Sequence, residues 1–188
     1  MTDRACVLWL LLAQALLGAF DTLYFHEWRA RLPALGRSAR DELRLHWARS
    51  MIYAFLFAVL PWLEAGGAWA WLLMGCVVAE VFITVADFVV EDRVRLPRGG
   101  VYPGERATHT VMAILHGAIL AFLLPLLWKA RELPTAWVSE PAPVAPWLRW
   151  TFALLAAGVF LSGVRDLVAS TGARGSSWPW PKIPVGAR

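Results

Sequence analysis

The chain has 188 residues, 59% of them hydrophobic, and a mean hydropathy of +0.52. Soluble domains contain about 45–50% apolar residues, and the excess here falls in long blocks, which excludes a soluble globular fold. The formal net charge of +4 would suit nucleic acid, but in a membrane protein it reflects basic loops on one side, and no nucleic-acid partner is expected.

Five apolar stretches follow one another along the chain, and each is long enough for a membrane-spanning helix, which needs roughly 20 residues. The runs lack period-2 alternation, which argues against membrane strands. The sequence therefore predicts an all-α, polytopic membrane bundle. Its five transmembrane helices are expected at Ala5–Tyr24, Trp47–Leu63, Gly67–Val90, Val111–Trp128 and Trp147–Val168.

The domain prediction is a single transmembrane unit over residues 1–170, followed by a Trp- and Pro-rich cytoplasmic tail over residues 171–188. A signal peptide cleaved after Ala13-Gln14-Ala15 is the alternative for the first stretch, but its apolar run continues past that site. Four helices should build a polar core, with the fifth beside them.

The connections carry recognisable turn and cap signals. Ser38-Ala-Arg-Asp41 predicts a capping box that starts the second helix, which makes Asp41 a cap. Glu64-Ala-Gly-Gly67 predicts a tight external turn, so the second and third spans should be antiparallel neighbours. Residues 134–146 read as a Pro-rich external linker, and Arg165-Asp166 as an interfacial ion pair.

Basic residues are divided unevenly by the five spans. Of the 18 Lys and Arg, 14 fall on one side and 4 on the other. The positive-inside rule places the basic side in the cytoplasm. This predicts a multi-pass plasma (inner) membrane protein with its N-terminus outside and its C-terminus in the cytoplasm.

Ionisable residues inside spans are unfavourable, yet here they recur at helical spacing. Separations of three, four or seven residues place side chains on one helical face. The second, third and fourth helices carry such stripes, and the first adds two groups near its cytoplasmic end. The residues are Asp21 and His26, then Glu42 and His46, then Glu80, Asp87 and Glu91, and finally Glu105, His109 and His116.

These groups are expected at matching depths. Glu80 and His116 each lie eleven residues inward from the acid at the cytoplasmic end of their helix, or about 16 Å along the axis. They should therefore meet deep in the membrane, while Asp87 and His109 share a level nearer the cytoplasm. A structural hydrogen bond is the alternative to a ligand role for both pairs.

Carboxylates and imidazoles gathered in a helical bundle indicate a metal site, since mixed oxygen and nitrogen ligation suits iron, manganese or zinc. The pattern is similar to carboxylate-bridged di-iron and di-manganese bundle proteins in ligand type and helix number. Their motif is Glu-x-x-His, whereas this chain has Glu42-x-x-x-His46 and Glu105-x-x-x-His109. We expect one or two divalent ions, iron first and zinc or manganese as alternatives, with ligands from Glu42, His46, Asp87, Glu91, Glu105 and His109, and with Glu80, His116, Asp21 and His26 as further candidates.

The function expected from this pattern is a metal-dependent integral membrane enzyme, of the di-iron oxidoreductase type, acting near the cytoplasmic face. Membrane lipids and a lipophilic small-molecule substrate delivered through the bilayer are the expected partners. Zinc hydrolysis is possible with the same ligands. The rival hypotheses are an accessory subunit associated with other membrane subunits, a proton or cation relay, and haem ligation by two histidines.

Overall fold

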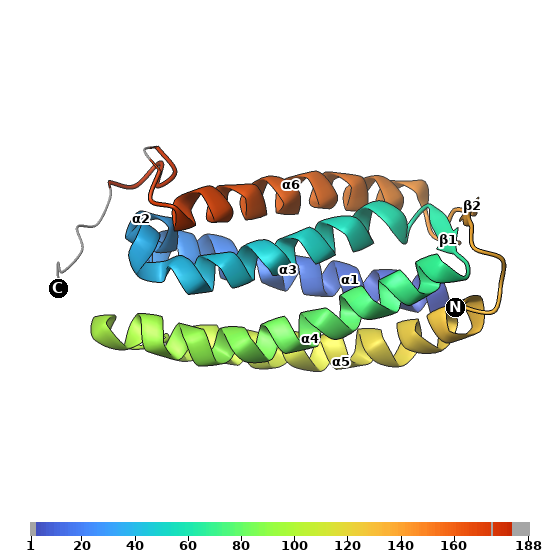
Figure 1. The fold of residues 1–188 in the computed structure, drawn as a ribbon, viewed down its shortest axis with the longest axis horizontal. Coiled ribbons are helices and arrows are strands. Elements are labelled where there is room, and N and C mark those ends of the chain that lie inside the picture. Colours follow the sequence, from blue (N-terminus) through green and yellow to red (C-terminus); the bar gives the residue numbers. More distant parts are fainter. Residues whose placement is uncertain (1–2, 174, 182–188) are drawn as a thin grey trace.

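The computed structural model describes residues 3–173 and 175–181, so residues 182–188 of the predicted tail lie outside the described residues. Five long helices lie side by side in one elongated bundle (Figure 1). The elements in chain order are α1 (Asp3–Phe20), η1 (Asp21–Arg29), α2 (Leu32–Leu35), η2 (Gly36–Ala39), α3 (Arg40–Val59), β1 (Leu63–Ala65), α4 (Ala68–Arg95), η3 (Leu96–Arg98), α5 (Pro103–Ala130), β2 (Trp137–Ser139) and α6 (Pro146–Ser170).

Four helical segments are long and apolar enough to cross a membrane, namely Asp3–Arg29, Ala68–Arg98, Pro103–Ala130 and Pro146–Ser170. This confirms the all-α class and indicates a multi-pass membrane protein. Large apolar side chains cover the outer surface, as Phe82 at 71% and Leu154 at 76% exposure illustrate. Such surfaces suit membrane lipids.

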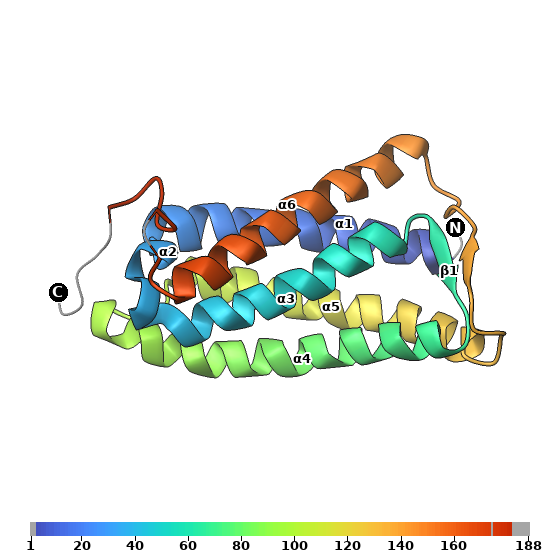
Figure 2. The same ribbon diagram turned by 45° about the horizontal axis from the view of Figure 1, so that its top comes forward.

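The remaining long helix, α3, is the least apolar because its first half is rich in charged residues. It packs between α4 and α6, and within residues 45–59 only Ala58 is exposed. Within that stretch its polar side chains are buried or half-buried against other helices, and the charged residues of the first half explain why hydropathy alone does not select α3. Figure 2 shows α6 crossing α3 at an angle, at the edge of the bundle.

The ends of the helices differ from the predicted turn chemistry in two places. The capping box at Ser38 and Asp41 is wrong: α3 follows the 3-10 turn η2, and no side chain caps its first residues. The external turn and linker instead form a short antiparallel sheet, in which Glu64 of β1 lies opposite Val138 of β2. Gly67 has φ +56°, and Thr135 of the linker packs against its α-carbon.

The two halves of the bundle have opposite character. The half next to β1 and β2 is filled by an apolar cluster that includes Leu8, Leu56, Leu73, Leu123 and Phe152. The other half contains the buried ionisable residues, and a small apolar cluster of α2, α3 and α6 closes it from the end, with Leu32, Leu35 and Ala169 at its centre. The buried ionisable residues therefore lie between these two apolar clusters.

Candidate metal centre

All ten residues singled out from the sequence are buried, none more than 9% exposed. Their contacts divide them into two groups at different depths. The group nearer α2 contains four residues that could share one ion, and the group nearer the middle of the bundle surrounds an arginine. An arginine lies at each level: Arg95 of α4 lies beside the first group, and Arg49 of α3 lies within the second.

The four-ligand cluster consists of His26 on η1, Glu91 on α4, and Glu105 and His109 on α5. Each offers one ligand atom, and these atoms all lie within 4.8 Å of one another. Ligands bound at about 2.0–2.2 Å can be at most about 4.4 Å apart across one ion. That limit applies to ligands on opposite sides of the ion, whereas tetrahedral ligands lie about 3.3–3.6 Å apart. The side chains would therefore have to move together by up to about 1 Å to bind a single metal.

Several atoms of this cluster are close together without being hydrogen-bonded to each other. His26 Nε2 lies 3.2 Å from Glu105 Oε1, yet it has no aligned partner among the described residues, and neither does Glu91 Oε1 or Glu105 Oε2. Buried polar atoms are normally satisfied. Atoms that crowd together but do not bond one another fit ligands arranged around a common cation.

Asp21 orients both histidines from beside the cluster. Its Oδ2 lies 3.2 Å from His26 Nε2 and makes a 3.1 Å hydrogen bond with His109 Nε2. A neutral imidazole carries a proton on one ring nitrogen and a lone pair on the other. A second carboxylate, Glu91, lies 3.4 Å from His109 Nδ1, so the lone pair is on Nδ1 in the tautomer whose Nε2 proton is held by Asp21. Metal-binding histidines commonly have such a carboxylate partner.

A π-helix places Asp21 and His26 together. On an α-helix, residues five apart lie about 140° apart around the axis, so this pair could not meet. The segment η1 instead has π geometry, and its end is marked by the Ala30 N–H donating to the Phe25 carbonyl at 2.8 Å. The i→i+5 bonding of a π-helix stacks Asp21 over His26. Sequence periodicity assumes α geometry and does not find this pairing.

Glu42 is held by an arginine that the sequence interpretation counted only among the basic residues of the cytoplasmic side. Arg95 donates to Glu42 Oε1 at 2.7 Å and lies 3.4 Å from Glu105 Oε1. Glu42 is fully buried, and Arg95 is 2% exposed. The pair supports the cluster from the α2 side, where Glu42 neutralises Arg95 instead of joining the four ligands. Arg95 lies four residues after Glu91, so its helical face was available as a signal.

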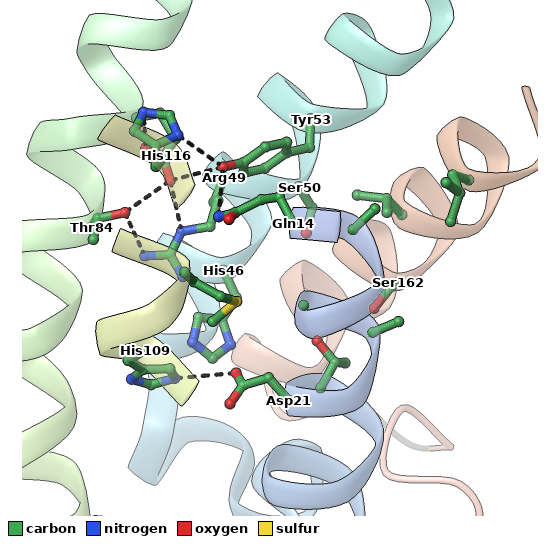
Figure 3. Close-up of a pocket in the computed structure, with 18 of the residues that line it drawn as sticks. Gln14, Asp21, His46, Arg49, Ser50, Tyr53, Thr84, His109, His116 and Ser162 are labelled. Carbon is green, nitrogen blue, oxygen red and sulfur yellow. Dashed lines mark hydrogen bonds and ion pairs between the residues drawn. The ribbon is translucent and has the colours of Figure 1, made fainter. Parts of the chain in front are cut away.

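The second group surrounds Arg49 of α3 (Figure 3). Its guanidinium lies 3.1 Å from Asp87 Oδ2 and 3.6 Å from Glu80 Oε1, and it donates to Thr84 Oγ1 at 3.2 Å. His46 lies 3.5 Å from Asp87. A permanent cation therefore already stands among the carboxylates at this level. The spacing of Arg49, three residues after His46, places both on one face.

His116 meets Glu80 at 2.9 Å, as their matching depth predicted. Tyr53 extends this contact, since its hydroxyl lies 3.2 Å from His116 Nδ1 and accepts from Gln14 Nε2 at 3.3 Å. The expected pairing of Asp87 with His109 is not found. Asp87 turns to Arg49 and His46 of α3, while His109 turns to Asp21 and Glu91.

The polar half contains more buried acid than permanent cation. Two arginines, Arg49 and Arg95, face seven buried carboxyl groups. Uncompensated charges in a low-dielectric interior are strongly unfavourable, so protons or a bound cation must balance the difference. The seven acids are Asp21, Glu42, Glu80, Asp87, Glu91, Glu105 and Asp166.

A cavity of about 800 Å³ adjoins both groups and is lined by all five long helices. Some lining residues are also exposed on the outer surface, and we infer that the cavity opens sideways beside them. One opening lies between α1 and α6, and another between α4 and α5. The exposed lining residues are Ala19, Leu23, Leu154 and Gly158 at the first opening and Val81, Val85, Phe88, Ala113 and Gly117 at the second.

The α1–α6 opening is bounded at both ends. Trp9 and Trp147 meet edge to face with ring centroids 5.8 Å apart near the β strands. At the other end Arg165 forms an ion pair with Glu27 of η1. The expected Arg165–Asp166 ion pair is wrong, because Arg165 reaches across to η1 while Asp166 points into the cavity wall and is 8% exposed.

No family model, curated protein or solved structure matches this chain. The chemistry of the site is therefore argued from its own residues.

Proposed function

We propose that this chain is a metal-dependent integral membrane enzyme, an iron-type oxidoreductase acting on a lipophilic substrate. The observation that carries the proposal is the four-ligand cluster, four buried ligand-type side chains within 4.8 Å of one another. The cluster adjoins a cavity that opens toward lipid. A buried ligand set beside an accessible apolar cavity is the arrangement such an enzyme requires.

One metal ion fits the geometry better than a pair. At the second level the guanidinium of Arg49 supplies the positive charge between Asp87 and Glu80. We therefore assign the ion to the level of His26 and His109. Two histidines with carboxylates suit iron, manganese or zinc, and two histidines with one carboxylate and open positions are typical of non-haem iron oxygenases.

The chain's own residues suggest how the site would work. Asp21 holds the two imidazoles in orientation, and the Glu42–Arg95 pair fixes the side of the cluster next to α2. A bound ion would supply Lewis-acid or redox chemistry. The apolar clusters on either side exclude water from the ion, which strengthens electrostatic interactions within the site.

The proposed orientation puts the metal end at the cytoplasmic face of the plasma (inner) membrane. The connections at that end are basic, with Arg31 and Arg37 around α2 and Arg98 in η3. By the positive-inside rule this end is cytoplasmic and the β1–β2 end is external. The start of α1 would then lie outside and the end of α6 inside.

A proton or cation relay is less well supported by the same structure. Buried acids and histidines form a continuous ladder only as far as Gln14, Tyr53 and His116. Beyond them the bundle is filled by the apolar cluster around Leu8 and Leu56. A relay needs polar groups or water across the whole membrane, and within the described residues the ladder ends halfway.

Metal analysis of the purified protein tests this proposal. Protein extracted in mild detergent without chelators should contain about one iron per chain, because the four-ligand cluster can hold a single ion. His109→Ala should lose most of that metal. Glu132→Ala, which alters a 72% exposed side chain beyond the far end of α5, should retain it. Equal metal in wild type and His109→Ala would refute the site, and zinc in place of iron would refute the oxidoreductase form.

A further inference from the structure

Among the seven buried acids of the described residues, Asp166 is the one that neither the four-ligand cluster and its supporting residues nor the group around Arg49 and His116 accounts for. It lies on α6, which packs against α3, and its side chain lines the cavity. It is 8% exposed, and no hydrogen bond or ion pair to it occurs within residues 3–173 and 175–181. A buried carboxylate without a partner is unfavourable unless a ligand or proton compensates it.

Three carboxyl groups line the cavity, and unpaired buried acceptors occur there beside nitrogen atoms of His26, Arg49 and His116 that also lack an aligned partner in the described part of the chain. Asp21 Oδ1 and Gln14 Oε1 are buried without a partner among the described residues, and both residues line the cavity together with Glu80 and Asp166. Arg49 is the single arginine or lysine among the described lining residues, and Asp87 and Glu80 already engage it. Asp166 is therefore an unengaged acceptor for a donor group, whereas the described lining residues include no unengaged lysine or arginine for an anionic head group.

The α1–α6 opening offers a path for an alkyl chain. Leu23 at 67% and Leu154 at 76% exposure flank it on the lipid side. Gly158 lies between them and Asp166, and a side chain added there would meet nothing within 4 Å. In Figure 3, Ser162 of α6, one turn before Asp166, lies across the cavity from His46 and Asp21. The mouth is therefore apolar, and the depth of the cavity is polar and acidic.

We propose that the cavity binds a long-chain primary amine, with Asp166 accepting its ammonium group and the alkyl chain leaving between α1 and α6. This inference rests on the proposed function only in taking the cavity as the substrate site. An ammonium group has three donors and no acceptor, which suits the unpartnered carboxyl group of Asp166 and the unpaired Oδ1 of Asp21. A charge-assisted bond to a buried carboxylate is among the stronger hydrogen bonds.

Equilibrium binding of radiolabelled dodecylamine to the protein in zwitterionic nanodiscs tests the inference, with binding to empty nanodiscs subtracted. Asp166→Asn should weaken binding at least about tenfold, or about 1.4 kcal/mol, and Asp166→Glu should restore most of it. Asp92→Asn is the matched control, because Asp92 is an exposed acid paired with Arg106. Dodecanoate and dodecanol should compete at least about tenfold less well than the unlabelled amine.

Gly158→Leu keeps the inference testable if Asp166→Asn does not fold. The added side chain has room in the opening and should abolish amine binding while leaving the fold and the metal content unchanged. Unaltered amine binding in Asp166→Asn or in Gly158→Leu would overturn the inference, as would equal competition by dodecanoate or dodecanol. Metal content measured on the same samples is a separate readout, and its absence from wild type would contradict the proposed function alone.

Discussion

At the scale of single residues, the polar half depends on cations that offset buried acids. Glu42 is fully buried, and Arg95 is its partner at 2.7 Å. Removing one member of a buried ion pair leaves the other charge uncompensated, whereas replacing both by apolar groups is often nearly neutral. The pair as a whole therefore adds little to the free energy of unfolding, whereas loss of either member alone is strongly destabilising.

Arg95→Met should lower the unfolding free energy by about 3–5 kcal/mol. The double variant Arg95→Met/Glu42→Leu should recover most of that loss. Unfolding of the detergent-solubilised protein, followed by tryptophan fluorescence, gives both values. An Arg95→Met protein as stable as wild type would show that Glu42 is not charged in the folded state.

Asp21→Asn should weaken metal binding about 10–100-fold without abolishing it, since carboxylates that orient metal-bound histidines contribute on that scale. The reason is the 3.1 Å contact with His109 Nε2, which fixes the imidazole with Nδ1 toward Glu91. Competition against a chelator of known affinity measures the change. A loss as complete as that in His109→Ala would make Asp21 a direct ligand.

Sequence reasoning identified which residues are buried but not how they pair. All ten candidates are buried, because helical stripes of ionisable residues in apolar spans have no other favourable place. Pairing depends on contacts between helices that a stripe does not encode. The sequence interpretation counted Arg49 and Arg95 only among the basic residues of the cytoplasmic side, yet each reaches a carboxylate on another helix.

At the scale of elements, hydropathy does not predict the environment of α3, and helical periodicity does not predict the geometry of η1. Helices were predicted at both places, but α3 begins seven residues before the predicted span and is not among the four helices apolar enough to cross a membrane, and η1 changes helix type. Hydropathy assumes lipid around each span, and stripe analysis assumes 3.6 residues per turn. The contact between Asp21 and His26 depends on breaking the second assumption.

The turn between α3 and α4 should tolerate no side chain at Gly67. A β-carbon there would lie 2.4 Å from Thr135 Oγ1, and φ is +56°. Gly67→Ala should lower the unfolding free energy by at least about 1–3 kcal/mol. Gly75→Ala is the matched control, because a β-carbon at this position in α4 meets nothing within 4 Å, and it should raise stability by up to about 1 kcal/mol. Equal effects in the two variants would contradict the packing of the linker on this turn.

At the scale of the whole molecule, the two halves of the bundle predict its orientation. The basic loops and the polar core share one end, and the β1–β2 sheet lies at the other. In a background with Cys6 and Cys76 replaced by serine, Val101→Cys in the α4–α5 connection should resist a membrane-impermeant maleimide in intact cells. Glu140→Cys near β2 should react. The reverse pattern would invert the proposed topology.

The central claim is that one ion is bound by His26, Glu91, Glu105 and His109. Anomalous difference maps collected on both sides of the absorption edge of the bound metal locate that ion directly. The account predicts a single peak about 2.0–2.2 Å from one atom of each of the four residues, at the level of Asp21 and not at that of Arg49. A peak beside Glu80 and Asp87, or no peak in protein that contains stoichiometric metal, would contradict it.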